Sequence, residues 1–156
     1  MITVGSGHTA ALTITQTATG TDTFDASEYT GDLTVGINSE GQGADTVTGG
    51  TGTNDTLSFT AVASEAITAD DMNTVTAFEN VVIANNVAFS LTTHDLTNAT
   101  VAMDVDATAM TSAIFDFSGA NEDDGTFNIT VGGTGAHIVT LGQLGDTLTS
   151  TSTGAI

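Results

Sequence analysis

The sequence predicts an all-β fold, either a β-solenoid of the β-roll kind or a β-sandwich, with at most one short helix near residues 68–76. Threonine makes up roughly a fifth of the chain, and threonine and valine both favour strands. The 18 glycines supply turns, and proline is absent. Apolar and polar residues alternate over short stretches that clusters of Asn, Asp and Gly separate, which is typical of both architectures.

The expected elements follow from local patterns along the chain. Leu12 and Ile14 alternate with threonines and predict a strand near the N-terminus. Residues 68–71 have the pattern of a capping box ahead of Met72, which predicts the helix. The stretch 78–89 is strongly β-like, and apolar/polar alternation returns in three later segments: 101–105, 114–117 and 127–131.

The 156 residues are enough for one domain with a real core, and no change in composition marks a linker, so we expect 1–156 to be a single domain.

The charge of the chain restricts its partners. The chain has no lysine or arginine and 19 acidic residues, for a net charge of -19. Such a fold repels itself unless metal ions or salt offset the charge. Nucleic acid and anionic membranes are excluded as expected partners because both require basic residues.

The sequence contains no N-terminal signal peptide, no membrane-spanning stretch and no cysteine. The N-terminal residues lack the basic and apolar regions of a secretory signal peptide. No stretch approaches the roughly 20 apolar residues that cross a bilayer, so membrane insertion is not expected. Without cysteine there is neither a disulfide nor a thiolate metal site.

A repeated nonapeptide carries the clearest chemical signal. Residues 40–57 hold two tandem copies of the template G-G-x-G-x-D-x-U-x, in which U is a large apolar residue. The first copy, 40–48, has Glu40 in place of the leading glycine and matches at Gly41, Gly43, Asp45 and Val47. The second copy, 49–57, matches at its glycines, including Gly50 and Gly52, places Asn54 on the aspartate position, and then slips by one residue at Asp55 and Leu57.

Weaker copies lie on both sides of this pair. Residues 20–24 match the second half of the template through Asp22. A second tandem pair covers 132–149, with His137 on the aspartate position of its first copy and Asp146 in register in its second. We expect His137 to disable its turn as a calcium site.

These repeats predict calcium turns. Calcium takes about 6–8 oxygen ligands, which glycine-rich backbone and an aspartate can supply together, with positive φ at the glycines. The acidic loop 121–125 is a further candidate calcium loop. Plain tight turns between strands are the alternative for every copy. The expected metal ligands are Asp22, Glu40, Gly41, Gly43, Asp45, Gly50, Gly52, Asn54, Asp55, Asp123, Asp124 and Asp146.

Residues 40–57 resemble the RTX repeats of proteins exported by type I secretion, and the threonine-rich texture is similar to that of bacterial surface-layer proteins and adhesins. The resemblance implies calcium-stabilised folding outside the cell and export by an uncleaved C-terminal signal, without an N-terminal signal peptide. RTX blocks usually have many repeats. With two pairs only, the resemblance implies that degenerate turns or another molecule complete the sites.

The sequence contains little that would indicate a catalytic site. The three histidines, His8, His94 and His137, lack zinc-site spacing. A glycosidase could use the acid pairs at 70–71, 104–106 or 122–124, but its sugar site would be expected to offer aromatic faces, and the chain has no Trp and one Tyr. We expect no enzyme; a hydrolase with converging acids is the third hypothesis.

The sequence therefore predicts an extracellular structural protein that self-assembles with calcium into a surface layer, sheath or filament. Its expected partners are other copies of itself, joined head to tail through the N-terminal strand and the C-terminal coil 132–156. The alternative is a calcium-stabilised adhesion or binding module of a larger secreted surface protein. The two hypotheses differ in whether the open strand edges meet another molecule or a neighbouring domain.

Overall fold

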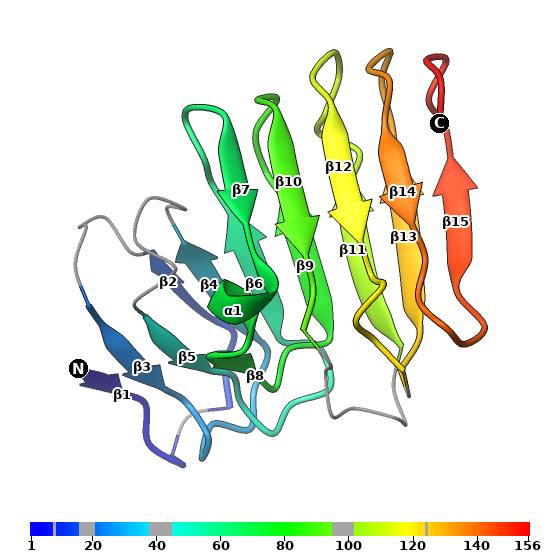
Figure 1. Ribbon diagram of the computed structural model, residues 1–156. Coiled ribbons are helices and arrows are strands. Elements are labelled where there is room, and N and C mark those ends of the chain that lie inside the picture. The colour runs from blue at the N-terminus through cyan, green and yellow to red at the C-terminus, as the bar shows by residue number, and fades with distance from the viewer. Residues whose placement is uncertain (8, 16–20, 38–44, 95–101, 124) are drawn as a thin grey trace.

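The computed structural model describes residues 1–156 apart from 8, 16–20, 38–44, 95–101 and 124. The chain winds into a β-solenoid, and the described strands pair in parallel throughout (Figure 1). The N- and C-termini lie at opposite ends of the stack (Figure 1). The prediction of a nearly all-β fold is confirmed, and of its two forms the solenoid is the correct one.

Three sheets form the faces of the solenoid. The long sheet has the order β15-β13-β11-β9-β6-β4-β2. Its strands are β2 (Leu12–Thr15), β4 (Leu33–Ile37), β6 (Thr56–Phe59), β9 (Asn80–Ile83), β11 (Met103–Ala107), β13 (Phe127–Val131) and β15 (Thr147–Ser150). The N-terminal sheet contains β1 (Ile2–Thr3), β3 (Thr23–Asp25), β5 (Thr46–Thr48) and β8 (Val75–Thr76). The C-terminal sheet contains β7 (Glu65–Ile67), β10 (Phe89–Thr92), β12 (Phe115–Ser118) and β14 (Ile138–Thr140).

The coils are longer than two nonapeptides in the middle of the molecule. The register of the long sheet aligns Val81 with Val105 and Val105 with Ile129, and residues in equivalent places there are 24 apart. At the C-terminal end the spacing falls to 19, as between Phe127 and Asp146. Each tandem pair still forms strands on two faces, since β5 and β6 begin within the two copies of the first pair, and β14 and β15 within those of the second.

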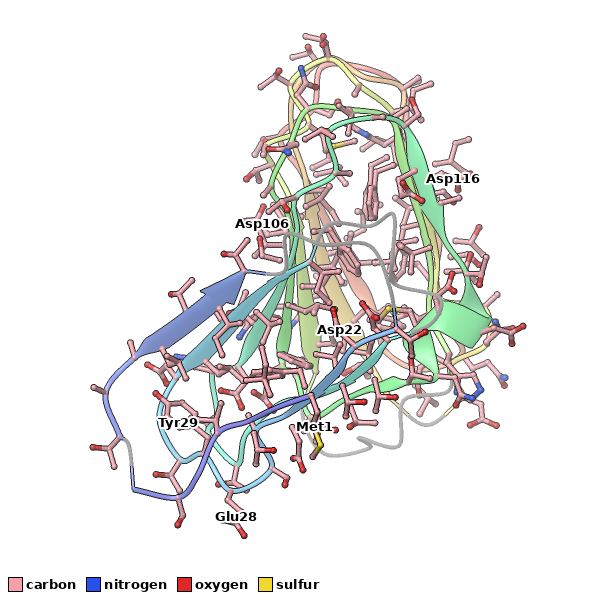
Figure 2. All side chains as sticks on the ribbon, turned by 90° about the vertical axis from the view of Figure 1, so that its left-hand side faces the viewer. Met1, Asp22, Glu28, Tyr29, Asp106 and Asp116 are labelled. Carbon is pink, nitrogen blue, oxygen red and sulfur yellow. The ribbon has the colours of Figure 1, made fainter. Side chains whose placement is uncertain are left out.

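The core lies between the sheets because apolar residues alternate with polar ones along each strand. In the long sheet one column of aligned residues is buried: Val35, Leu57, Val81, Val105 and Ile129. The neighbouring column faces outward as a polar ladder: Thr34, Thr56, Asn80, Asp104 and Asn128. Figure 2 looks along the stack and shows Asp106 and Asp116 on the outer sides of two different sheets.

The predicted helix is confirmed but shorter than the expected range 68–76. Helix α1 covers Ala69–Met72, and its capping box is present, with Thr68 N donating to Asp71 Oδ2 at 2.8 Å. Met72 is buried in the core. The helix ends early because Val75 and Thr76 form β8, which pairs with β5.

Candidate functional site: inter-coil turns and open ends

The motif aspartates occupy one equivalent place in the fold. Asp45, Asp55, His137 and Asp146 each directly precede a strand, namely β5, β6, β14 and β15. Asp55, and not Asn54, takes the aspartate place of the second copy, because the one-residue slip in the sequence moves it there. Each of the four side chains meets a backbone N–H of the preceding coil.

Asp55 shows this arrangement most completely. Its side chain is fully buried; Oδ1 accepts from the Leu33 N–H at 3.0 Å and Oδ2 from the Gly50 N–H at 2.8 Å. A Cβ on Gly50 would lie 2.6 Å from the Tyr29 carbonyl oxygen and 2.9 Å from Asp55 Oδ2, and one on Gly52 would lie 3.1 Å from Asp55 Oδ1. The glycines therefore leave room for the carboxylate and for the neighbouring coil.

Gly50 and Gly52 allow close packing between coils, whereas the sequence predicted that they would adopt positive φ. Among the described residues, positive φ occurs only at Ala77, Gly133 and Gly145. Gly50 and Gly52 are not among them, so the expectation of positive φ at these two predicted ligands is wrong. Close packing of one coil on the next, and not left-handed backbone, requires glycine there.

The other two aspartates make equivalent bonds. Asp146 Oδ1 accepts from the Phe127 N–H at 2.9 Å, and its Oδ2 accepts from the Gly142 N–H at 2.6 Å. Asp45 is buried and its Oδ1 accepts from the Asp22 N–H at 2.7 Å. The structure thus brings Asp22 and Asp45 together through the backbone of Asp22. In all three turns the carboxylate fastens the beginning of a strand in the coil before it.

Glu79 joins the series, and the sequence analysis missed it. It directly precedes β9, and its Oε2 accepts from the Asp55 N–H at 2.8 Å. In return the Glu79 N–H donates to the Asp55 carbonyl oxygen at 3.1 Å. Its place immediately before a strand is the signal that could have revealed it, although it belongs to no glycine-rich repeat.

His137 holds the same place with a neutral side chain. The ring is buried, and its Nδ1 accepts from the Phe115 N–H at 3.2 Å. Its Nε2 lies 2.7 Å from the Gly132 carbonyl oxygen. We assign the tautomer with hydrogen on Nε2, because Nδ1 must accept while Nε2 donates.

Burial gives the Asp55 carboxyl an unusual environment. Desolvation raises the pKa of Asp55 above its usual value, and the nearby charge of Asp32 acts in the same direction. The N–H groups of Leu33 and Gly50 oppose the rise by stabilising the charged form. By contrast, hydrogen bonds from Ser27 lower the pKa of the partly exposed Asp25.

The remaining predicted ligands do not gather around these turns. Asn54 and Asp123 are exposed, and Glu122, which was not predicted as a ligand, is buried and accepts from the Gly125 N–H at 2.8 Å. Within the described part of the chain, no three His, Cys, Asp or Glu side chains are grouped as a metal would require. Four predicted ligands lie outside the described residues: Glu40, Gly41, Gly43 and Asp124.

The donor chemistry of the Asp55 turn suits a hard cation, but one turn supplies few ligands. It presents a carboxylate and backbone carbonyl groups, which are the oxygen donors that calcium prefers. Each carboxylate oxygen already accepts one N–H, and calcium needs about 6–8 oxygens. A calcium ion bound here would require further oxygens from a neighbouring turn.

The two ends of the long sheet form a second candidate site. Within the described chain, β2 and β15 each have a hydrogen-bonded neighbour on one side only. Neither strand contains an acidic residue, although the chain has 19. Ile14 and Leu148 pack against the core but remain partly exposed. Large exposed apolar side chains also occur at these ends: Met1, Ile2, Ile138, Leu141, Leu144 and Ile156.

Comparison of the chain with protein-family models, curated proteins and solved structures gives no significant match. In the described ranges, no helix has the length and apolar character needed to cross a bilayer. The function is therefore argued from the geometry of the turns and of the solenoid ends.

Proposed function

We propose that the chain is an extracellular structural protein that assembles end to end, with calcium, into a surface layer, sheath or filament. The observation that carries this proposal is the pair of open edges at β2 and β15, which lie at opposite ends of the long parallel sheet (Figure 1). Open edges present unpaired backbone N–H and C=O groups that readily pair with another strand. A head-to-tail contact of this kind propagates when it does not close.

The two edge strands have matching patterns. Carrying the register of the long sheet from β15 into β2 of another copy places Thr147 beside Thr13, Leu148 beside Ile14 and Thr149 beside Thr15. Threonines would then face outward and aliphatic side chains inward on both strands. The contact would cover the exposed parts of the two aliphatic side chains and extend the core from one subunit into the next.

The edges also lack the features that usually block such pairing. Many proteins protect edge strands with lysine, proline or an inward-pointing charge. This chain contains no lysine or proline, and β2 and β15 are uncharged. Repulsion between subunits comes instead from the remaining surface, because each copy carries a charge of -19.

Calcium enters the proposal as the cation that offsets this repulsion. The protein has no lysine or arginine to neutralise its carboxylates, so cations from solution must do so. The turns around Asp45, Asp55 and Asp146 would hold calcium with oxygens from neighbouring turns, and bound calcium would supply positive charge there. This part of the proposal rests on charge and donor type.

Negative-stain electron microscopy and analytical sedimentation test the assembly. The chain is compared in excess chelator, in millimolar magnesium and in millimolar calcium. We expect single particles in chelator and ordered fibres or sheets with calcium. Equal assembly in all three conditions would refute the calcium requirement, whereas single folded particles throughout would favour a module whose edges neighbouring coils of a longer polypeptide cover.

A proline in β2 tests which edge makes the contact. Leu12 N donates to Asp32 O in the neighbouring coil, so the alternation of a parallel strand directs the Thr13 N–H to the free edge. Thr13→Pro should abolish assembly and leave the fold intact, because it removes a donor that no described strand uses. Thr13→Val is the matched control, since it keeps the N–H and should assemble. If Thr13→Pro assembles normally, the β2 edge is not the interface.

A further inference from the structure

His137 differs from the other motif side chains in the charge state that its contacts require. The carboxylates of Asp45, Asp55 and Asp146 accept hydrogen bonds in their charged form. The His137 ring must be neutral to accept the Phe115 N–H at Nδ1. Its other nitrogen donates to Gly132 O at 2.7 Å, so both ring nitrogens are engaged.

Protonation of the ring would remove the hydrogen bond from the Phe115 N–H to Nδ1. In the imidazolium form both ring nitrogens carry hydrogen, so Nδ1–H would face the Phe115 N–H. The side chain is only 3% exposed, so water has little access to replace the lost acceptor. The Phe115 N–H would remain buried without a partner, which is the most unfavourable state of a backbone donor.

The surroundings offer little compensation for a positive ring. The residues that bond to the ring or to its backbone N–H are Phe115, Gly132 and Ala155, and none of them is acidic. Nearby along the chain, Asp106 Oδ1 is already bonded to Thr108 N at 2.8 Å and to Thr108 Oγ1 at 2.7 Å.

One further acidic residue lies next to Phe115 in sequence. Asp116 follows Phe115 in β12, where Figure 2 shows it on the outer side of the sheet, away from the core. The His137 N–H itself donates to the Ala155 carbonyl oxygen at 2.9 Å, which is an uncharged partner. The charge of -19 attracts protons at long range, while the local hydrogen bonds of His137 require the neutral ring.

We propose that His137 is an acid-sensitive latch that holds the last coil onto the solenoid. Histidine ordinarily changes its charge between about pH 5 and 8. Acidification would therefore loosen β14 from β12 while the coils fastened by Asp45 and Asp55 stay closed. The latch does not depend on self-assembly, and it is testable on the unassembled chain in chelator.

Amide hydrogen exchange measured by NMR or fragment-resolved mass spectrometry tests the latch directly. Exchange of the Phe115 N–H is compared at about pH 7.5 and pH 5.5 after correction for the intrinsic rate. We expect protection in the wild type to fall about tenfold at the lower pH. Protection of the Leu33 N–H, which Asp55 holds, should not fall and serves as the internal reference.

His137→Asn is the matched variant. Its amide oxygen takes the place of Nδ1 and can accept the Phe115 N–H, and the side chain does not titrate; the shorter amide does not extend as far toward Gly132 O as Nε2 does. We expect it to keep Phe115 protected at both pH values. His94→Asn controls for another histidine and should retain the wild-type loss. If His137→Asn proves unstable, His137→Asp restores the acid of the other turns and should also remove the change. Equal loss of protection in the wild type and the stable variant would overturn the proposal.

Discussion

The Asp55 turn and the His137 turn perform the same structural task with different chemistry. Each side chain precedes a strand, is buried, and accepts the N–H at the beginning of a strand in the preceding coil. Asp55 brings a negative charge into the core, whereas His137 remains neutral. This place in the fold therefore requires a hydrogen-bond acceptor aimed at the preceding coil. His137 meets this requirement with a neutral ring, and Asp55 meets it with a carboxylate.

Removing either of these two acceptors gives the largest expected loss of stability. Asp55→Ala leaves the buried N–H groups of Leu33 and Gly50 without partners, and His137→Ala does the same to Phe115. We expect each variant to lose about 2–4 kcal/mol of unfolding free energy in chelator, measured by urea denaturation. The exposed Asp123→Ala is the control and should match the wild type. If Asp55→Ala behaves like this control, its hydrogen bonds contribute little to holding the coils together.

Calcium should affect the stability of the two turn variants differently. If the Asp55 turn binds calcium, the ion stabilises the wild type by about 2.7 kcal/mol at a hundredfold excess over its dissociation constant. Asp55→Ala should lose part of this gain, and His137→Ala should keep all of it. The measurement is the same urea denaturation, repeated in calcium and in chelator. Equal calcium gains for the two variants would show that Asp55 is not a ligand.

A methyl group at Gly50 tests the close contact between coils. Its Cβ would lie 2.6 Å from the Tyr29 carbonyl oxygen, so backbone must move in Gly50→Ala. We expect a loss of about 1–3 kcal/mol, as for other overpacking changes in a tight site. Gly5→Ala is the matched control, because no atom lies within 4 Å of its added Cβ. Equal unfolding midpoints for the two variants would contradict the packing seen at this turn.

Local patterns were enough to predict much of the fold. The alternation at Leu12 and Ile14 gives β2, and the capping box at 68–71 gives the start of α1. These signals depend on neighbours a few residues away, which the sequence displays directly. The tandem pairs also mark strands on two faces of the solenoid, because glycine-rich turns and the apolar residues after them lie next to each other in the chain.

The long-range features could not be predicted in this way. The partner of Asp55 is Leu33, which is 22 residues away, and Glu79 reaches Asp55 across 24. These contacts depend on the length of the coil, which varies along the molecule and exceeds two nonapeptides at its middle. The role of His137 was also hidden, because the template treats it as a lost ligand, while the fold uses its Nδ1 as an acceptor.

The smallest expected effect is the pH dependence of the charged turn. Burial raises the pKa of Asp55 in the folded state above its unfolded value, near 3.8. The folded state therefore binds more protons than the unfolded state between these two values, and stability falls as pH rises through this window. Asp55→Asn has no such group. The stability of the wild type relative to this variant should accordingly increase as pH falls from neutrality toward about 4.

Comparing the two proteins at each pH cancels the contribution of the other acidic residues, which titrate in both. The measurement is urea denaturation in chelator at several pH values. A constant difference would mean that the hydrogen bonds from Leu33 and Gly50 fully offset the burial of the charge. A difference that shrinks on acidification would mean that they outweigh it, and the Asp55 carboxylate would then stabilise the fold even without a cation. The change of this stability difference with pH thus distinguishes a charged turn that needs calcium from one whose carboxylate is already satisfied by the backbone of the preceding coil.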